Sequence, residues 1–242
     1  MRIAVLSDIH ANLEALQAVQ QKAAGMGVDA WVCLGDIVGY GADPGPCVDQ
    51  VRALVQDAVL GNHDAAAVGL LDMNYFNPWA RRAAEWTAAR LAAADAAYLA
   101  ALPLIRDGDD VLYVHADPHC PDEWDYIHSA DQIEAVLEAA VVRLCFIGHT
   151  HTPFVWGRSG ASAQSLAAAG PVVLEEGVSY LVNVGSVGQP RDGDPRACFA
   201  LWDAAARTLE LVRVDYPIDA AQKKILAAGL PPFLAQRLAL GH

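Results

Sequence analysis

The sequence lacks an apolar run long enough to cross a membrane. Hydrophobic residues make up 54% of the 242 residues, but much of this share is alanine, and charged residues such as Glu138 and Arg143 interrupt the most apolar central segment. A membrane-spanning helix needs about 20 consecutive apolar residues, so we expect no span. The apolar run at residues 3–6 meets Asp8 too soon to serve as a secretory signal, so we expect no export either.

Paired cysteines are also lacking. The five cysteines are odd in number and far apart in the sequence, and none belongs to a Cys-x-x-Cys pair. The pattern therefore indicates neither a disulfide framework nor a structural zinc site. We expect a cytoplasmic protein, because a reducing compartment suits unpaired thiols.

Positive charge is scarce. The chain has 16 lysines and arginines against 29 aspartates and glutamates, which gives a formal net charge of −13. Such a surface repels nucleic acid and anionic lipid, so we expect no stable nucleic-acid binding and no membrane association. If the substrate is an anion, a local positive group must attract it. The sequence leaves the oligomeric state open.

The composition is otherwise that of a folded globular protein, and we expect one catalytic domain over residues 1–242. Its first half alternates short apolar runs with helical patterns. Residues 3–6, 30–34 and 58–60 are predicted strands, and residues 13–23 and 48–55 are predicted helices. Right-handed crossovers would make these strands parallel. Residues 65–102 are rich in alanine and predict a helical insertion or cap.

The second half contains more strands than helices. Strands are predicted at residues 111–114 and 144–147, with a helix at 131–140 between them. Further strands are predicted at residues 154–156, 172–174, 180–182, 198–201 and 209–214. We expect these later strands to form a second, largely antiparallel sheet. The tail at residues 217–242 is predicted to be helical, with a break at Pro231 and Pro232.

Side chains of the kinds that bind metals follow five of the predicted strands. They are Asp8 and His10; Asp36; Asn62, His63 and Asp64; His115; and His149 and His151. Sites in parallel sheets gather just outside the carboxyl ends of the strands, so we expect these segments to converge in one crevice. One such motif alone is usually a solvated loop, whereas five in this order indicate a site.

The residue types in these segments suit two divalent cations. Without His63 and Asp64 they comprise two carboxylates, one amide oxygen and four imidazoles, whereas a single zinc ion needs only three or four ligands. We expect the Asp-x-His and His-x-His pairs to lie on extended chain, where side chains at i and i+2 point the same way. Gly35, Gly61 and Gly148 precede three of the segments and would allow close backbone approach.

This series of motifs resembles the calcineurin-like metallophosphoesterase family. The resemblance covers residues 3–152, from Asp8-x-His10 through Gly35-Asp36, Gly61-Asn62-His63-Asp64 and His115 to Gly148-His149-Thr150-His151. Residues 183–196, which read NVGSVGQPRDGDPR, are similar to a segment of a small bacterial branch of that family. The resemblance implies an α/β fold: a four-layer α/β/β/α sandwich of two mixed β-sheets flanked by helices, with a small helical cap.

The resemblance also implies a ligand set for each of two cations. The first cation would be held by Asp8, His10, Asp36 and His151, and the second by Asp36, Asn62, His115 and His149. Asp36 would bridge the ions at about 3.5 to 4 Å, so that a hydroxide between them attacks phosphorus in line. Manganese is the expected metal, and iron, zinc, nickel or cobalt would also suit these ligands.

Three further residues receive catalytic roles. The family pattern makes His63 the residue that faces the leaving oxygen, as an acid or a hydrogen-bond donor. Asp64 would either orient His63 or cap the following helix. Arg191 would clamp phosphate, although arginines in surface turns more often do not. Tyr40, Tyr75, Phe76 and Trp79 suit the packing core of the helical segment, with an aryl or nucleotide pocket as the alternative.

The function implied is hydrolysis of a phosphodiester or phosphomonoester in a small phosphorylated substrate. A protein phosphatase and a dinucleoside polyphosphate hydrolase are alternatives within the enzyme class. A non-catalytic protein-binding scaffold on the same fold is the alternative outside it. A metallo-β-lactamase-type zinc hydrolase is excluded, because Thr152 and Pro153 follow His151 where that site needs a His-x-His-x-Asp-His run.

Overall fold

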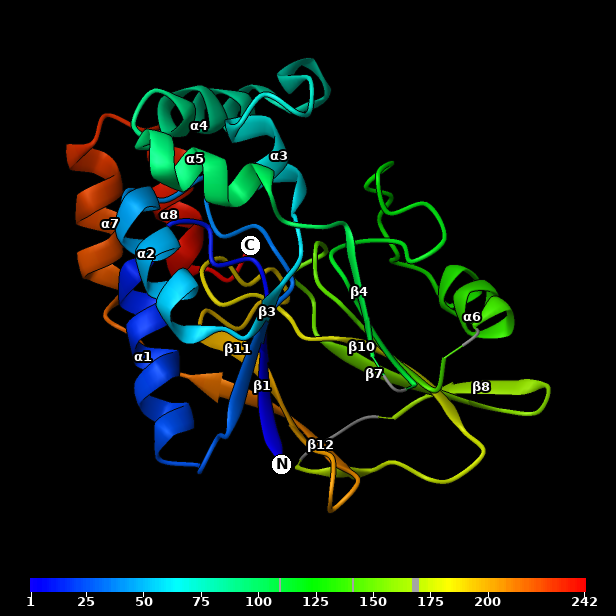
Figure 1. The fold of residues 1–242 in the computed structure, drawn as a ribbon. Helices are drawn as coiled ribbons and strands as arrows, with labels where there is room; N and C mark the ends of the chain where they lie inside the picture. The colour runs from blue at the N-terminus through cyan, green and yellow to red at the C-terminus, as the bar shows by residue number, and fades with distance from the viewer. Residues whose placement is uncertain (109, 141, 167–169) are drawn as a thin grey trace.

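Two mixed β-sheets pack face to face at the centre of the computed structural model (Figure 1), which describes residues 1–108, 110–140, 142–166 and 170–242. Helices cover the outer face of each sheet. The arrangement has four layers and confirms the predicted α/β/β/α sandwich. No helix in these described ranges combines the length and the apolar character that a membrane crossing needs.

The first sheet, sheet A, has six strands. Their order is β3 (Asp57–Ala58), β2 (Ala30–Cys33), β1 (Arg2–Leu6), β11 (Ala197–Asp203), β12 (Thr208–Val214) and β9 (Val172–Val173). The strands β1, β2 and β3 run parallel, as the sequence predicts. The pairs β1–β11, β11–β12 and β12–β9 are antiparallel.

The second sheet, sheet B, also has six strands. Their order is β4 (Ile105–Gly108), β5 (Val111–Val114), β6 (Leu144–Ile147), β10 (Ser179–Asn183), β7 (Phe154–Ser159) and β8 (Ser162–Ser165). The central strand β6 pairs in parallel with both β5 and β10, and the outer pairs are antiparallel.

Most of the described helices cover sheet A. They are α1 (Leu13–Ala24), α2 (Pro44–Leu54), α3 (Asn62–Ala67), α4 (Pro78–Ala88), α5 (Ala93–Ala100), α7 (Ile218–Ala227) and α8 (Pro232–Gln236), with the 3-10 helix η2 (Arg237–Ala239). The 3-10 helix η1 (Met73–Tyr75) contacts α4 and has no buried residue. Helix α6 (Ala130–Ala139) packs on sheet B at the opposite side of the molecule (Figure 1). The treatment of residues 65–102 as an insertion and of 217–242 as a tail stays a prediction.

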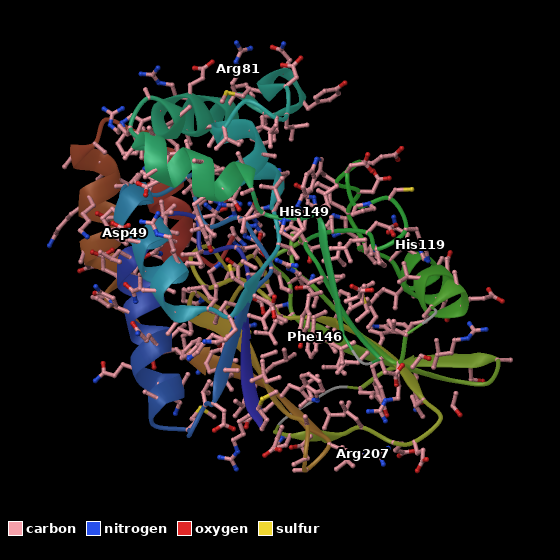
Figure 2. The ribbon with its side chains drawn as sticks, in the orientation of Figure 1. Asp49, Arg81, His119, Phe146, His149 and Arg207 are labelled. Carbon is pink, nitrogen blue, oxygen red and sulfur yellow. The ribbon has the colours of Figure 1, made fainter. Side chains whose placement is uncertain are left out.

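Alternating side chains on the central strands build the three apolar layers. Ile3 and Val5 of β1 lie between the two sheets, whereas Ala4 and Leu6 face the helices on sheet A. In β6, Phe146 lies between the sheets (Figure 2) and Ile147 faces α6. A strand buried on both faces needs apolar residues at every position, which explains the uninterrupted apolar runs in the sequence.

The prediction of a separate antiparallel sheet after Thr152 is wrong. Strands β9, β11 and β12 join β1 in sheet A, while β7, β8 and β10 join β6 in sheet B. An apolar strand pattern shows that a strand is buried, but its neighbour is decided by long-range packing. The expected crevice is consequently formed by strand ends from two sheets, with β1, β2 and β3 in one sheet and β5 and β6 in the other.

Candidate metal centre

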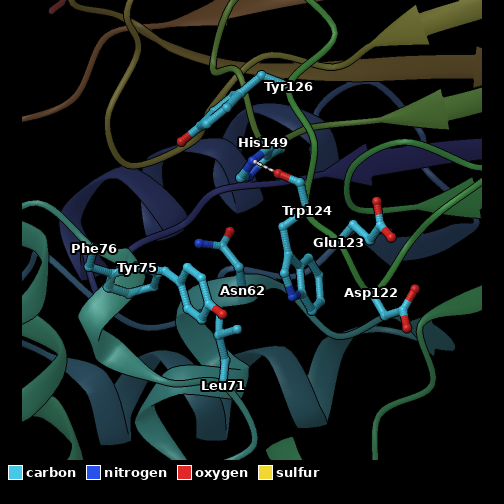
Figure 3. Close-up of a pocket in the computed structure, with 9 residues that line it drawn as sticks. All are labelled: Asn62, Leu71, Tyr75, Phe76, Asp122, Glu123, Trp124, Tyr126 and His149. Carbon is cyan, nitrogen blue, oxygen red and sulfur yellow. Dashed lines mark hydrogen bonds between the residues drawn. The ribbon is translucent and has the colours of Figure 1, made fainter.

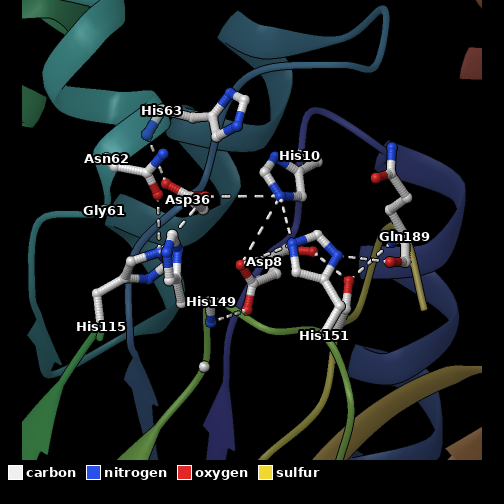
Figure 4. A network of polar contacts seen from close by, with 12 residues as sticks. Asp8, His10, Asp36, Gly61, Asn62, His63, His115, His149, His151 and Gln189 are labelled. Carbon is white, nitrogen blue, oxygen red and sulfur yellow. Dashed lines mark hydrogen bonds and ion pairs between the residues drawn. The ribbon is translucent and has the colours of Figure 1, made fainter. Parts of the chain in front are cut away.

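All seven predicted metal ligands lie together at one end of the two sheets (Figure 4). Asp8 and His10 follow β1, Asp36 follows β2, Asn62 begins α3 after β3, His115 follows β5, and His149 and His151 follow β6. All seven residues are buried, and the most exposed of them, Asn62, has a relative exposure of only 6%. The strand ends therefore bring together donor atoms from segments far apart in the sequence.

The first group of donors consists of Asp8, His10 and His151. The Nε2 atoms of His10 and His151 lie 3.1 Å apart. Asp8 Oδ1 lies 3.2 Å from His151 Nε2 and 3.7 Å from His10 Nε2, and it accepts no hydrogen bond from the residues that the structure describes. Three potential ligand atoms thus face one another.

The second group of donors consists of Asn62, His115 and His149. His115 Nε2 lies 3.2 Å from both His149 Nδ1 and Asn62 Oδ1. Asp36 lies between the groups, with its Oδ2 atom 3.4 Å from His115 Nε2 and 3.6 Å from His10 Nε2. The carboxylate of Asp36 can therefore reach a cation in either group.

Backbone carbonyl groups fix the protonation of the imidazoles. His10, His151 and His115 donate through Nδ1 to the carbonyl oxygens of Val38, Gln189 and Leu34, at 3.1, 2.6 and 2.7 Å. His149 donates through Nε2 to the carbonyl oxygen of Trp124 at 2.9 Å. Because a carbonyl oxygen only accepts, each facing nitrogen in a neutral ring carries a lone pair. Two lone pairs about 3 Å apart need a cation or a proton between them, so these residues fit a metal ion.

The charges of the cluster agree with cation binding. Burial favours the neutral acid of Asp8 and Asp36, but the surrounding histidines outweigh it and hold the pKa of both carboxyls below the usual range. Burial likewise disfavours protonated His115, yet Asp36 and other acceptors raise its pKa to about 9. Burial dominates at His149 and lowers its pKa to about 3. The buried pair of carboxylates is thus ionised and needs compensating positive charge.

The backbone at the ligands is not extended, so the expected geometry of the Asp-x-His and His-x-His pairs is wrong. Five of the seven ligands have positive φ angles, namely Asp8 (54°), His10 (50°), Asp36 (51°), His149 (64°) and His151 (61°). Residues other than glycine rarely adopt this left-handed conformation, and it concentrates at functional sites. As a result, His149 and His151 point into different donor groups rather than toward one ion.

Close backbone contacts explain two of the glycines that precede the ligands. A Cβ atom on Gly148 would lie 2.6 Å from Asp8 Oδ2 and would also overlap Ser7 Oγ. A Cβ atom on Gly61 would overlap the backbone nitrogen and the carboxylate of Asp36. Any larger residue at these positions would displace a ligand.

The segment at residues 183–189 makes hydrogen bonds with the loops that carry the ligands. Ser186 Oγ donates to the carbonyl oxygen of Asp8 at 2.8 Å, and Asn183 Nδ2 donates to that of Gly148. The backbone nitrogen of Gly188 also donates to Asp8, at 2.9 Å, while the carbonyl oxygen of Gln189 accepts from His151 (Figure 4). These contacts hold the strained loops in place.

Comparisons with known proteins agree with this site. The family model described as the calcineurin-like phosphoesterase superfamily domain matches residues 1–207. The chain belongs to this family. Phosphoesterase relatives include a metallophosphoesterase of Sphaerobacter thermophilus, whose crystal structure is 40% identical, covers 100% of this chain and 99% of its own, and has a TM-score of 0.88. The family resemblance inferred from the motifs is therefore confirmed.

Two further proteins are also similar to this chain along its length. An uncharacterized protein of Methanocaldococcus jannaschii is 41% identical over 244 aligned residues, which cover 99% of this chain and 98% of the relative. The crystal structure of a hypothetical protein from Pyrococcus horikoshii is 19% identical, covers 100% of this chain and 98% of its own, and has a TM-score of 0.80. At that identity the second match shows the shared fold only.

His63 lies at the edge of the candidate metal centre. Its ring centroid is 4.9 Å from that of His10, 4.4 Å from Tyr40 and 4.6 Å from Phe76. Its Nδ1 atom is buried and has no hydrogen-bond partner in the described part of the chain. Burial lowers the pKa of His63 to about 4 against the opposing effect of Asp36. A donor atom of His63 also lies within 4.8 Å of donor atoms of His10 and Asp36.

Asp64 contacts backbone groups. Its Oδ1 atom accepts from the backbone nitrogen of Val38 at 3.0 Å, and its Oδ2 atom accepts from that of Gly61 at 3.3 Å. Among the contacts of the described residues, none joins Asp64 to the ring of His63. The geometry therefore favours the capping alternative over the orienting one. Burial, with Asp36 nearby, raises the pKa of Asp64 to about 7.

Arg191 lies beside the centre, whereas Arg196 does not. The backbone nitrogen of Arg191 donates to the carbonyl oxygen of His151 at 3.3 Å, and its guanidinium donates to Gln189 Oε1 at 2.9 Å and lies 5.7 Å from the ring centroid of Tyr40. Arg196 instead pairs with Asp194 at 2.6 Å on the surface. Arg191 can therefore reach a group bound at the metal centre.

The sequence prediction missed two of the aromatic residues that border the candidate metal centre, Trp124 and Tyr126, whereas it gave Tyr75 and Phe76 an aryl or nucleotide pocket as an alternative. Trp124 and Tyr126 lie in the loop after β5, and with Tyr75 and Phe76 they line a cavity of about 440 Å³ that reaches His149 (Figure 3). The expected packing role is wrong for Tyr75, which is 82% exposed. The sequence signal for Trp124 and Tyr126 is that two aromatic residues lie among acidic ones at positions 122–126, outside the predicted helices and strands.

Arg237 is a further missed residue. It lies beyond the residues that match the family model, and its guanidinium is 6.0 Å from the ring centroid of Tyr40. Partial burial, with Arg191 nearby, lowers the pKa of Arg237 to about 10. Two guanidinium groups therefore lie over one tyrosine ring that itself contacts His10 at 4.6 Å between centroids.

Proposed function

We propose that the protein is a dinuclear-metal-dependent phosphoester hydrolase that acts on a small phosphorylated compound. The observation that carries the proposal is the pair of donor groups, each with two imidazole nitrogens facing each other at 3.1 or 3.2 Å, with Asp36 between them. Neither group satisfies itself with hydrogen bonds when its rings are neutral. Membership of the phosphoesterase family supports the same chemistry.

We propose that Asp8, His10, Asp36 and His151 hold one cation, and that Asp36, Asn62, His115 and His149 hold the other. Two divalent cations supply Lewis acidity at the phosphoryl oxygens and a water acidified for in-line attack on phosphorus. Oxygen and imidazole donors suit manganese, which we propose as the metal, and also iron, cobalt, nickel and zinc. The cytoplasmic location and the lack of nucleic-acid partners stay predictions.

The protein's own groups orient the substrate and handle its leaving group. His63 borders the centre without a partner on Nδ1, and we assign its imidazole to donate to the leaving oxygen. Arg191 would donate to a phosphoryl oxygen from the side of His151, because its guanidinium has no carboxylate partner among the described ion pairs. The carbonyl contacts of the four ligand imidazoles keep the opposite ring nitrogen of each directed inward.

Hydrolysis of two chromogenic esters tests the proposal. Purified protein with added Mn²⁺ is expected to release p-nitrophenolate from bis-p-nitrophenyl phosphate or p-nitrophenyl phosphate. Asp36→Asn is expected to abolish turnover, and His63→Ala to lower kcat by about 10²- to 10⁴-fold, the usual contribution of a positioned proton donor. The matched controls Asp49→Asn and His119→Ala alter exposed side chains away from the centre and should retain activity.

The scaffold alternative predicts a different outcome. The wild type and Asp36→Asn are compared with each ester and each added metal. If the wild type never shows more turnover than the variant, the protein is not a hydrolase of this kind and the scaffold interpretation replaces it. The retention of all seven ligand residues favours the enzyme, because a binding scaffold has no need for facing imidazoles.

A further inference from the structure

A cavity of about 440 Å³ opens directly beside the metal centre (Figure 3). Two of its lining residues, Asn62 and His149, are also proposed metal ligands. A group attached to phosphorus at the centre can therefore extend into this cavity. Its volume falls within the range of about 300–1,000 Å³ that is usual for small-molecule sites.

Aromatic rings from two separate segments wall the cavity. Tyr75 and Phe76 come from η1 and its end, and Trp124 and Tyr126 come from the loop after β5. The ring of Tyr126 stacks on His149 with centroids 4.0 Å apart and planes 18° apart, and the carbonyl oxygen of Trp124 accepts from the same histidine. Tyr126 and Trp124 thus contact a proposed metal ligand directly.

Two of these rings are unusually open to solvent. Tyr75 is 82% exposed and Tyr126 is 44% exposed. Aromatic surface that gathers around a cavity, rather than in a core, is typical of a binding site. Aromatic faces favour a flat ring, which stacks on them over a large area.

The charges at the cavity limit what it can bind. Its rim carries the carboxylates of Asp122 and Glu123, and no lysine or arginine is among the described residues that line it. Arg191 and Arg237 do not line the cavity and lie over the ring of Tyr40, although Arg191 also contacts Tyr126 on the side of the metal centre. A second phosphate or a carboxylate would be repelled from the rim, whereas amino, amide or hydroxyl groups could donate to it.

We propose that this cavity binds a flat, uncharged ring of the substrate, so that the substrate class is an aryl or nucleoside-type phosphoester with hydrogen-bond donors on the ring edge. The proposal rests on the proposed hydrolase function, since it places the phosphorus at the metal centre. It excludes compounds with further negative charge beside Asp122 and Glu123. Nothing in the family motifs specifies these walls, because Tyr75, Trp124 and Tyr126 lie outside them.

Non-hydrolysable phosphonates test the ring preference without relying on turnover. Calorimetry with the Mn²⁺-supplied protein would compare phenylphosphonate with methylphosphonate, which share the same head group. The wild type is expected to bind phenylphosphonate at least about tenfold more tightly, as ring stacking on aromatic side chains provides. Tyr75→Ala and Trp124→Ala should reduce that ratio toward one with little change for methylphosphonate. Tyr75 is the safer variant, because its exposed ring contributes little to folding.

Trp79→Ala is the matched control. Trp79 is 49% exposed, but it packs on Phe233 and does not line the cavity. It should keep the wild-type ratio. A wild-type ratio near one, or an equal loss in Trp79→Ala and Tyr75→Ala, would overturn the proposal.

A second pair of phosphonates tests the acidic rim. The wild type is expected to bind 4-carbamoylphenylphosphonate more tightly than the isosteric 4-carboxyphenylphosphonate, because only the latter brings a negative charge to Asp122 and Glu123. The double variant Asp122→Asn, Glu123→Gln should bind the two compounds about equally, while Glu138→Gln, on α6, should behave as the wild type. Equal wild-type binding of the two compounds would overturn the part of the proposal that concerns charge.

The two proposals fail in different ways. A ring preference that depends on Tyr75 and Trp124, in a protein that hydrolyses neither chromogenic ester, would support the cavity as a ring site and overturn the hydrolase. Hydrolysis of both esters with no preference for phenylphosphonate would support the hydrolase and overturn the ring site.

Discussion

Divalent cations are expected to stabilise the fold in two separable increments. The two donor groups consist of buried residues from distant segments, so a cation that binds them ties together β1, β2, β5 and β6 only in the folded state. Asp36 approaches both groups, at 3.6 Å from His10 and 3.4 Å from His115. Asp36→Asn should therefore remove both increments, whereas His115→Gln should remove only the one that depends on His149 and Asn62.

The size of each increment follows from binding linkage. A ligand present at 100 times its Kd stabilises the folded state by about 2.7 kcal/mol per site. Two sites give about 5 kcal/mol, and about 2–4 °C of melting temperature per kcal/mol is typical for a chain of this length, so the total shift is about 10–20 °C. His115→Gln should retain about half of it, and Asp36→Asn almost none.

Thermal unfolding with chelator and with excess Mn²⁺ measures the increments, and calorimetry counts the ions. Each variant is compared with its own chelated form, so a general loss of stability does not affect the result. The control His119→Gln alters an exposed histidine that pairs with Asp117 and should keep the full shift. One bound ion in the wild type, or a full shift in Asp36→Asn, would refute the assignment of two groups that share a carboxylate.

Two further predictions concern the core and the phosphate contact. Phe146→Ala should lower the free energy of unfolding by about 3–5 kcal/mol, because this fully buried ring fills the space between the sheets against Tyr113 and Trp202. Denaturant titrations measure this loss, and a value below about 1 kcal/mol would contradict that packing. Arg191→Gln should raise KM for p-nitrophenyl phosphate by about tenfold or more, because hydrogen bonds to charged groups contribute about 1.5–3 kcal/mol. The control Arg196→Gln should leave KM unchanged, because Arg196 pairs with Asp194. Equal KM values in the two variants would exclude the phosphate contact.

The sequence predicts the clustering of these seven side chains because their signal is local. Each of the five strands is an apolar run, and the polar residues after it, such as Asp8 or His149, stand out against it. The same reasoning fails for β4 and β8, whose sequences IRDG and SAQS are largely polar. Both are outermost strands of sheet B, where one side of the strand lacks a partner and the apolar requirement is weak.

The features that shape this candidate metal centre carry no comparable signal. Backbone carbonyl groups of Val38, Leu34 and Trp124 fix the imidazole protons, and every residue type has such a group. The left-handed backbone at Asp8 and His149 also runs against the usual preference for glycine, so no residue pattern announces it. Which nitrogen faces the cation is decided by the assembled fold.

The segment at residues 183–189 shows why the ligand loops keep this strained backbone. Strand β10 pairs in parallel with β6, so the chain that leaves it runs alongside the loop that carries His149 and His151. Its Asn183 and Ser186 side chains donate to carbonyl oxygens in the β6 and β1 loops, and the backbone of Gly188 donates to Asp8 as well. A Cβ atom on Gly188 would overlap the carbonyl oxygen of Ile9, so glycine is needed for this approach. The segment therefore contributes no metal-binding side chain, yet it compensates the backbone strain of the ligands from both sheets at once.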